Sequence, residues 1–214
     1  MDCWAGPNPR NLDTVPDPLP SSLARLMAEF EKLPGIGPRS AERLAFHILK
    51  SEKDAALGLA SAIREVKENV RHCRICYNLT EADPCPICTD AKRDASIVFV
   101  VEQPKDVLLL EATGLVRGVY HVLLGHISAL DGIEPGDLTI DALVARVKKG
   151  GVKEIVLATN PTMEGEGTGL HIKSVLASTG VQITRLARGL PRGSQIEYAN
   201  RAILQDAIEG RNAF

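Results

Sequence analysis

Four cysteines are the residues whose type and spacing say most about chemistry in this chain. They form two Cys-x-x-Cys pairs with eight residues between the pairs, and they are Cys73, Cys76, Cys85 and Cys88. This spacing lets four thiolates converge tetrahedrally on one Zn²⁺ at about 2.3 Å each. The spacer, residues 77–84, has too few apolar side chains to build a core, so the metal must supply the folding energy of the segment, about 10 to 16 kcal/mol for typical structural zinc sites. The pattern predicts one structural zinc ion per chain.

Two other uses of these cysteines are open from the sequence. They could form two disulfides, or one pair could be a redox-active motif. The N-terminus lacks the apolar stretch of an export signal, so we expect the protein to stay in a reducing compartment. In such a compartment, two matched Cys-x-x-Cys pairs favour a metal site over disulfides. A catalytic zinc would need an open coordination position, and four cysteines leave none. For the same reason we expect His47 and His72 to have structural roles.

A glycine-rich turn between two expected helices is the second segment with functional residue types. It reads LPGIGPRSA and begins at Leu33. Gly35 and Gly37 can take positive φ and let the backbone approach another surface, and Ile36 between them can fill the gap between the helices. The free N–H groups of the turn and of the following helix start then point outward together, which suits a phosphate oxygen.

Basic side chains follow this turn directly. Arg39 and Arg43 are four residues apart and therefore share one helical face. This is the helix-hairpin-helix pattern, which contacts nucleic-acid backbone and reads no base sequence. The alternative is a simple turn between two helices, in which the glycines serve geometry only. The predicted DNA contacts are Gly35, Gly37, Arg39, Ser40 and Arg43.

Hydrophobic periodicity divides the chain into a helical part and a following α/β part. Helices are expected from Ser21 to about Leu33, from about Arg39 to Leu49 and from about Asp54 to Val70. From residue 95 onward, apolar strands alternate with helices, which implies a parallel sheet covered on both faces. The expected strands are 97–101, 120–124, 154–158 and 182–186, and the expected helices are 107–112, 138–149, 170–179 and 199–209.

Composition and charge limit the class of protein. The chain has 214 residues, of which 44% are hydrophobic, so it can bury a core in one medium and one smaller domain. No apolar run approaches the roughly 20 residues of a membrane span, and we expect a cytoplasmic protein without membrane association. The net charge is only −2, but residues 21–75 carry 10 Lys/Arg against 7 Asp/Glu while residues 96–180 carry 7 against 10. Nucleic-acid contact should therefore favour the first segment.

Acidic residues lie where two of the expected strands end. Glu102 follows the first strand, and Glu164 and Glu166 belong to the segment after the third. The carboxyl ends of parallel strands meet at the edge where such sheets bind ligands. The third-strand segment resembles the metal-binding loop of Toprim domains, which are shared by topoisomerases, primases and some nucleases. Glu102 matches the glutamate that ends the first strand in those domains.

The aspartate pair of catalytic Toprim domains is missing, since Asn160 and Thr162 stand in its place. Magnesium needs hard anionic oxygens, and two-metal phosphoryl chemistry needs several carboxylates together. The loss of both aspartates argues against a nuclease, primase or topoisomerase. We expect Glu102, Glu164 and Glu166 to serve a partner protein or a residual metal. The alternative is a solvated acidic loop.

The order of helix-hairpin-helix, four-cysteine zinc site and degenerate Toprim segment is similar to the bacterial recombination-mediator family RecR. The likeness covers nearly everything from Leu23 to Arg211, through LPGIGPRSAERLAFHIL, CRICYNLTEADPCPIC, VVEQPKDV, GHISALDGI and ATNPTMEGEGT. The resemblance implies a non-enzymatic protein of DNA repair that binds single- and double-stranded DNA and acts with RecO and RecF to load RecA on single strands. It also implies dimers that close into a ring-shaped homotetramer, on the nucleoid when bound to DNA.

These observations together predict an α/β chain of five segments. A flexible proline-rich tail, whose Cys3 we expect to be an unpaired thiol, precedes a helix-hairpin-helix unit, a small four-cysteine zinc finger module, a Toprim-like parallel-sheet domain and a C-terminal strand and helix for assembly. The expected bounds are 1–20, 21–70, 71–94, 95–187 and 188–214. Two other classes stay open: a metal-dependent nuclease or primase-like enzyme using the three glutamates, and an adaptor whose hairpin holds subunits together without meeting DNA.

Overall fold

The structure is a computed structural model that describes residues 19–211. Most of the predicted proline-rich tail, with Cys3, lies outside the described residues. Internal contacts divide the chain into two units that separate after Glu68, so the zinc module and the sheet belong to one unit. Within the described part of the chain, none of the helices combines the length and apolar character needed to cross a bilayer.

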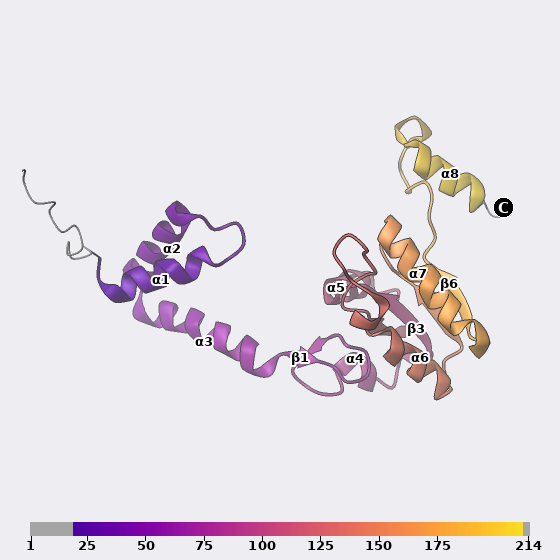
Figure 1. The fold of residues 1–214 in the computed structure, drawn as a ribbon, viewed down its shortest axis with the longest axis horizontal. Helices are drawn as coiled ribbons and strands as arrows, with labels where there is room; N and C mark the ends of the chain where they lie inside the picture. The colour runs from indigo at the N-terminus through magenta and orange to yellow at the C-terminus, as the bar shows by residue number, and fades with distance from the viewer. Residues whose placement is uncertain (1–18, 212–214) are drawn as a thin grey trace, which may run out of the picture. The chain divides into compact units, whose positions relative to one another are not determined.

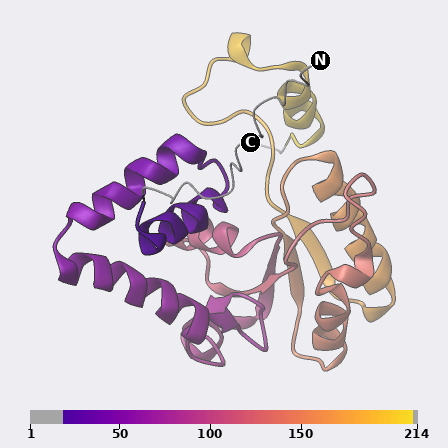
Figure 2. The same cartoon turned by 60° about the vertical axis from the view of Figure 1, so that its left-hand side comes forward.

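Three helices make up the first unit. They are α1 (Ser21–Glu31), α2 (Pro38–Lys50) and α3 (Lys53–Asn69). The first two lie side by side (Figure 1 and Figure 2), and between them they bury Leu23, Ala41 and Ala45. Small alanines on α2 let the two backbones approach closely. Helix α3 buries none of its residues within this chain, so its apolar side chains lack a core.

A small module of short elements begins the second unit. Strands β1 (Arg71–His72) and β2 (Leu79–Thr80) pair antiparallel, and a single helical turn, α4 (Pro86–Thr89), follows. These elements are too short for hydrophobic periodicity to predict them. Their positions follow the cysteines, since each Cys-x-x-Cys pair lies beside one of them.

The predicted parallel sheet is confirmed. Its strands are β3 (Asp94–Val101), β4 (Gly118–Val122), β5 (Glu154–Leu157) and β6 (Gln182–Arg185), in the order β4-β3-β5-β6, and all three pairings are parallel. The helices are α5 (Pro104–Ala112), α6 (Ile140–Lys148), α7 (Met163–Leu176) and α8 (Arg201–Glu209). Short 3-10 turns lie at Pro135–Asp137, Ala177–Thr179 and Ile196–Tyr198.

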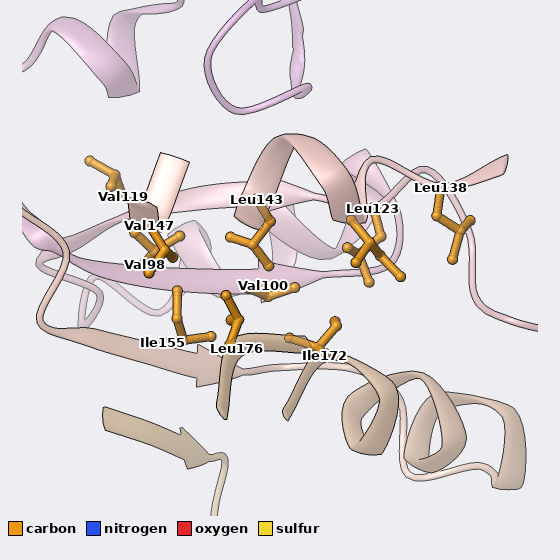
Figure 3. Packing of buried hydrophobic residues seen from close by; sticks show 11 residues of the cluster. Val98, Val100, Val119, Leu123, Leu138, Leu143, Val147, Ile155, Ile172 and Leu176 are labelled. Carbon is orange, nitrogen blue, oxygen red and sulfur yellow. The ribbon is translucent and has the colours of Figure 1, made fainter. Parts of the chain in front are cut away.

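Both faces of the sheet are covered. Successive side chains of a strand point to opposite faces, so β3 and β4 each contribute to two hydrophobic clusters. On one face, Val98 and Val100 of β3 pack with side chains of α6 and α7, and Figure 3 shows these side chains pointing toward one another. On the other face, Val101 packs with Val107 of α5 and with Tyr77 and other side chains of the zinc module. Helix α6 contributes Leu143 and Val147 to the first face, and helix α7 contributes Ile172 and Leu176, all labelled in Figure 3.

Helix α7 starts seven residues earlier than the sequence predicts. Its first residue is Met163, because the Thr162 side chain caps the helix by accepting a hydrogen bond from the Gly165 N–H at 3.1 Å. Glycines at 165, 167 and 169 have low helix propensity, so the sequence pattern does not predict the first turns of this helix. The predicted acidic loop is therefore wrong as a loop, and Glu164 and Glu166 stand in the first turn of a helix.

Candidate zinc centre and nucleic-acid interface

The four predicted zinc ligands come together in one cluster. Their Sγ atoms all lie within 4.8 Å of one another, and within residues 19–211 they form the one group of three or more His, Cys, Asp or Glu side chains arranged to hold a metal ion. The Sγ–Sγ distances are 3.5 Å between Cys76 and Cys85 and 4.0 Å between Cys73 and Cys88. Tetrahedral sulfurs at about 2.3 Å from Zn²⁺ would be about 3.8 Å apart. The cluster therefore fits one zinc ion and no disulfide.

Backbone groups around the cluster orient one of the four sulfurs, that of Cys73. The N–H groups of Ile75 and Cys85 donate to Cys73 Sγ at 3.5 and 3.3 Å. The loop between Cys73 and Asn78 closes on itself, because the Tyr77 N–H donates to the Cys73 carbonyl at 2.9 Å and the Cys73 N–H donates to the Asn78 carbonyl at 2.8 Å. These bonds orient the Cys73 ligand, and in zinc sites such outer contacts strengthen metal retention.

The sulfurs also influence each other's protonation. Hydrogen bonding from the Cys88 thiol lowers the pKa of Cys76 to about 5, and burial raises the pKa of Cys85 to about 11. Donation to Cys76 likewise raises the pKa of Cys88. A cluster of this kind gives up its remaining protons when a divalent cation binds, because thiolate is the form that ligates metal.

The zinc module is joined to the outer edge of β4. The Val122 N–H donates to the Cys76 carbonyl at 2.8 Å, and the Tyr77 ring meets the His121 ring edge-on with centroids 5.4 Å apart. His121 is fully buried, with its Nε2 3.0 Å from the Thr139 carbonyl, and burial lowers its pKa to about 4. His121 is therefore a neutral packing residue, and no sequence pattern points to it.

The predicted hairpin turn has the expected exposed form. Gly35 takes a φ of +78°, which glycine adopts without strain, whereas Gly37 is extended at −91° and caps α2. The expectation of positive φ thus holds at Gly35 alone. A Cβ at either glycine would meet no atom within 4 Å, so both face open space. Pro38 at the first helical position has no N–H to satisfy and starts the helix directly.

Basic side chains stand free beside this turn. Arg39, Ser40 and Arg43 are all exposed. Neither arginine forms a salt bridge with a described residue, so both guanidinium groups are available to an external anion. The turn and the first two turns of α2 thus present open backbone and two positive charges on one exposed surface.

Glu102 occupies the expected end of β3, but its carboxylate is already bonded. It is 3% exposed, and it accepts hydrogen bonds from the Asn160 N–H and from Asn160 Nδ2, each at 2.7 Å. His126 Nδ1 lies 3.3 Å from its Oε2. Space beside it is closed, since a Cβ at Gly165 would collide with Glu102 Oε1 and the Asn160 carbonyl. The residue that replaces the first Toprim aspartate is thus the main partner of the remaining glutamate.

The other two acidic residues do not join Glu102 in a metal-binding group. Glu166 pairs with Arg188 and, at 3.4 Å, with Arg185, and hydrogen bonding from Arg188 lowers the pKa of Glu166. The Glu164 carboxylate has no hydrogen bond or ion pair among the described residues. Neither the arginine pairing nor the Asn160 contact could be foreseen from the sequence, because both join segments that are far apart in the chain.

We predict that replacing Cys85 by Ser loosens residues 71–90 and lowers the stability of the zinc-loaded protein. A hydroxyl is a poor zinc ligand, so the site would fall to three thiolates and bind the metal weakly. The measurement is zinc content by elemental analysis together with the thermal unfolding midpoint.

A second variant, Cys88→Ser, removes another ligand and should give the same zinc loss. Parent protein that contains no zinc when purified under reducing conditions would contradict the assignment.

Comparison with known proteins agrees with this geometry. Three family models match: the RecR helix-hairpin-helix over residues 23–67, the RecR zinc finger domain with four cysteines over 70–90 and the Toprim domain over 96–187. The chain is 56% identical over 190 residues to Recombination protein RecR of Rhodopirellula baltica, covering 89% of this chain and 96% of the relative. The RecR of Rubrobacter xylanophilus is 52% identical with the same coverage, and that of Dehalococcoides mccartyi is 45% identical over 92% of this chain and 98% of the relative. The chain therefore belongs to the RecR family of recombination proteins.

Proposed function

We propose that this protein is a DNA-binding recombination mediator that acts without catalysis of its own. It acts with RecO and RecF in DNA repair and promotes RecA loading on single-stranded DNA, on the nucleoid. The observation that supports DNA binding is the open hairpin turn at Gly35 and Gly37 with the unpaired Arg39 and Arg43 beside it. Exposed N–H groups and two guanidinium groups suit phosphate oxygens and no particular base, so contacts of this kind bind single and double strands alike.

The absence of catalysis is supported by the state of the Toprim edge. A magnesium site would need free carboxylate oxygens near one another. Glu102 is bonded twice to Asn160, and Glu166 is paired with Arg185 and Arg188. The Glu164 side chain is left for contact with another molecule. We propose that this edge serves a partner protein such as RecO or RecF.

Self-association is the third part of the proposal. Helix α3 has four large apolar side chains that are more than 40% exposed, and α8 with its preceding turn carries others. Two separate apolar surfaces of one chain permit two different twofold contacts, and two such contacts can close a tetramer. The exposed residues of α3 are Leu57, Leu59, Ile63 and Val66, and those near the C-terminus are Ile196, Tyr198 and Ile208.

We predict that changing both Arg39 and Arg43 to Glu weakens binding to all DNA sequences alike. The loss of two phosphate contacts should reduce the salt slope of single-strand binding by about 1.4 and should leave any sequence preference unchanged. Fluorescence anisotropy across a salt series measures both quantities.

The matched control is Lys148→Glu with Lys149→Glu, which makes the same charge change on exposed positions at the end of α6, in the other unit of the chain and outside both proposed assembly surfaces. If the hairpin variant binds DNA like the parent protein, alone and with its partners, the hairpin is only structural.

We predict that the protein neither cuts, joins nor extends DNA with Mg²⁺ or Mn²⁺. Glu102→Gln should keep DNA binding largely intact, because Glu102 is buried and belongs to a different unit of the chain from the proposed contacts. Labelled substrates resolved on denaturing gels provide the test. Cleavage activity that copurifies with the protein and is lost in Glu102→Gln would favour the alternative, a Toprim nuclease.

We predict dimers at low concentration and tetramers at higher concentration, with deletion of residues 189–214 stopping assembly at the dimer. The deletion removes the apolar residues around α8 and leaves α3 in place. Light scattering over the micromolar range measures the mass. A constant mass of about 23 kDa over that range, where ordinary specific interfaces are populated, would rule out both contacts.

A further inference from the structure

The outer edge of β4 binds two groups from different parts of the second unit. The Leu123 N–H donates to the Val101 carbonyl of β3, so by the alternation of a strand the backbone groups of Val122 and Tyr120 face away from the sheet. The Val122 N–H donates to the Cys76 carbonyl at 2.8 Å, and the Tyr120 carbonyl accepts a hydrogen bond from Arg146 Nη1 at 2.8 Å. The two attachment points are two residues apart, or about 7 Å along the strand.

Arg146 is a half-buried cation of α6 without a carboxylate partner. It forms no salt bridge with any acidic side chain of residues 19–211. A cation taken out of water needs a compensating charge. Burial lowers the pKa of Arg146, and the negative charge of Cys88, Cys76, Cys73 and Cys85 opposes that effect. The geometry agrees with this, because the Arg146 guanidinium and the Cys76 carbonyl are bonded to the same edge of β4 at positions two residues apart.

The zinc centre has the complementary requirement. Four thiolates and one Zn²⁺ carry a net charge of −2, and three of the four cysteines are almost completely buried. The bonds to sulfur inside the module come from neutral backbone N–H groups. Among the arginines of the module and its flanks, Arg71 donates to the Glu81 carbonyl and Arg93 pairs with Glu111, whereas the Arg74 side chain is exposed to solvent, where its charge is screened.

We propose that Arg146 is the counter-cation of the zinc–thiolate cluster and helps the protein to retain its zinc. The guanidinium is fixed by the Tyr120 carbonyl at the strand edge where Cys76 is also held, so one strand positions both the ligand and the compensating charge. Arg146 is a positioning residue that acts from the sheet domain on a site in the zinc module. Zinc retention therefore depends on a residue that lies far from all four ligands in the sequence.

Three variants of Arg146 separate its charge from its hydrogen bond. Arg146→Lys keeps the charge and a donor, Arg146→Gln keeps a donor without the charge, and Arg146→Met keeps neither. Lys148→Met is the matched control, because Lys148 is an exposed cation of the same helix. The measurement is the rate at which the full-length, zinc-loaded protein gives up its zinc to an excess of a chromogenic chelator, read by absorbance.

We expect Arg146→Gln and Arg146→Met to release zinc about tenfold faster or more than the parent, as for the loss of other outer partners of metal ligands. Arg146→Lys and Lys148→Met should stay close to the parent rate. If Arg146→Gln releases zinc at the parent rate, or if Arg146→Lys releases it as fast as Arg146→Gln, charge compensation is wrong. The comparison of Lys with Gln decides the question even if Arg146→Met does not fold.

Discussion

The convergence of four thiolates is the interaction on which the zinc module depends, and through the module the cover of one edge of the sheet. Without a metal, residues 71–88 would offer two two-residue strands and one helical turn, which cannot hold a fold by hydrophobic burial. With a metal, the segment becomes rigid and presents the Cys76 carbonyl and the Tyr77 ring to β4. An edge strand otherwise leaves backbone groups unpaired. The metal thus stabilises the sheet indirectly, because it holds the segment that covers this edge.

A second link at the same edge shows why the module and the sheet form one unit. Arg93, just after the module, donates to both carboxylate oxygens of Glu111 at 2.9 and 2.5 Å and to the Gly118 carbonyl at 3.1 Å. The Tyr120 hydroxyl donates to the same carboxylate at 2.6 Å. Hydrogen bonding from Arg93 lowers the pKa of Glu111, so the carboxylate stays charged and keeps the network intact. This network ties the segment after the zinc module to α5 and β4 at the point where the chain enters β3.

Local signals predicted most of the fold, and tertiary contacts account for the rest. Cysteine spacing, the Gly35 turn and the apolar strands are each short-range patterns in the sequence. The cysteine cluster and the turn lie where the sequence predicts them, and the strands lie within three residues of their predicted bounds. The start of α7 was wrong because one capping threonine outweighed three glycines. The hydrogen-bond and ion-pair partners of Glu102 and Glu166 could not be predicted from the sequence for another reason. Asn160 and Arg188 reach them only after the strands have been placed side by side.

The exchange of aspartate for asparagine at residue 160 changes what a Toprim edge can do. An aspartate there would repel Glu102, and a cation would be needed to hold the two carboxylates together. Asparagine instead donates to Glu102 through its side chain and its backbone, so the buried carboxylate is satisfied without metal. Hydrogen bonds from Asn160 thus hold the Glu102 carboxylate in place at the edge of the sheet. An edge held in this way suits a protein whose proposed task is to hold DNA and partner proteins in place.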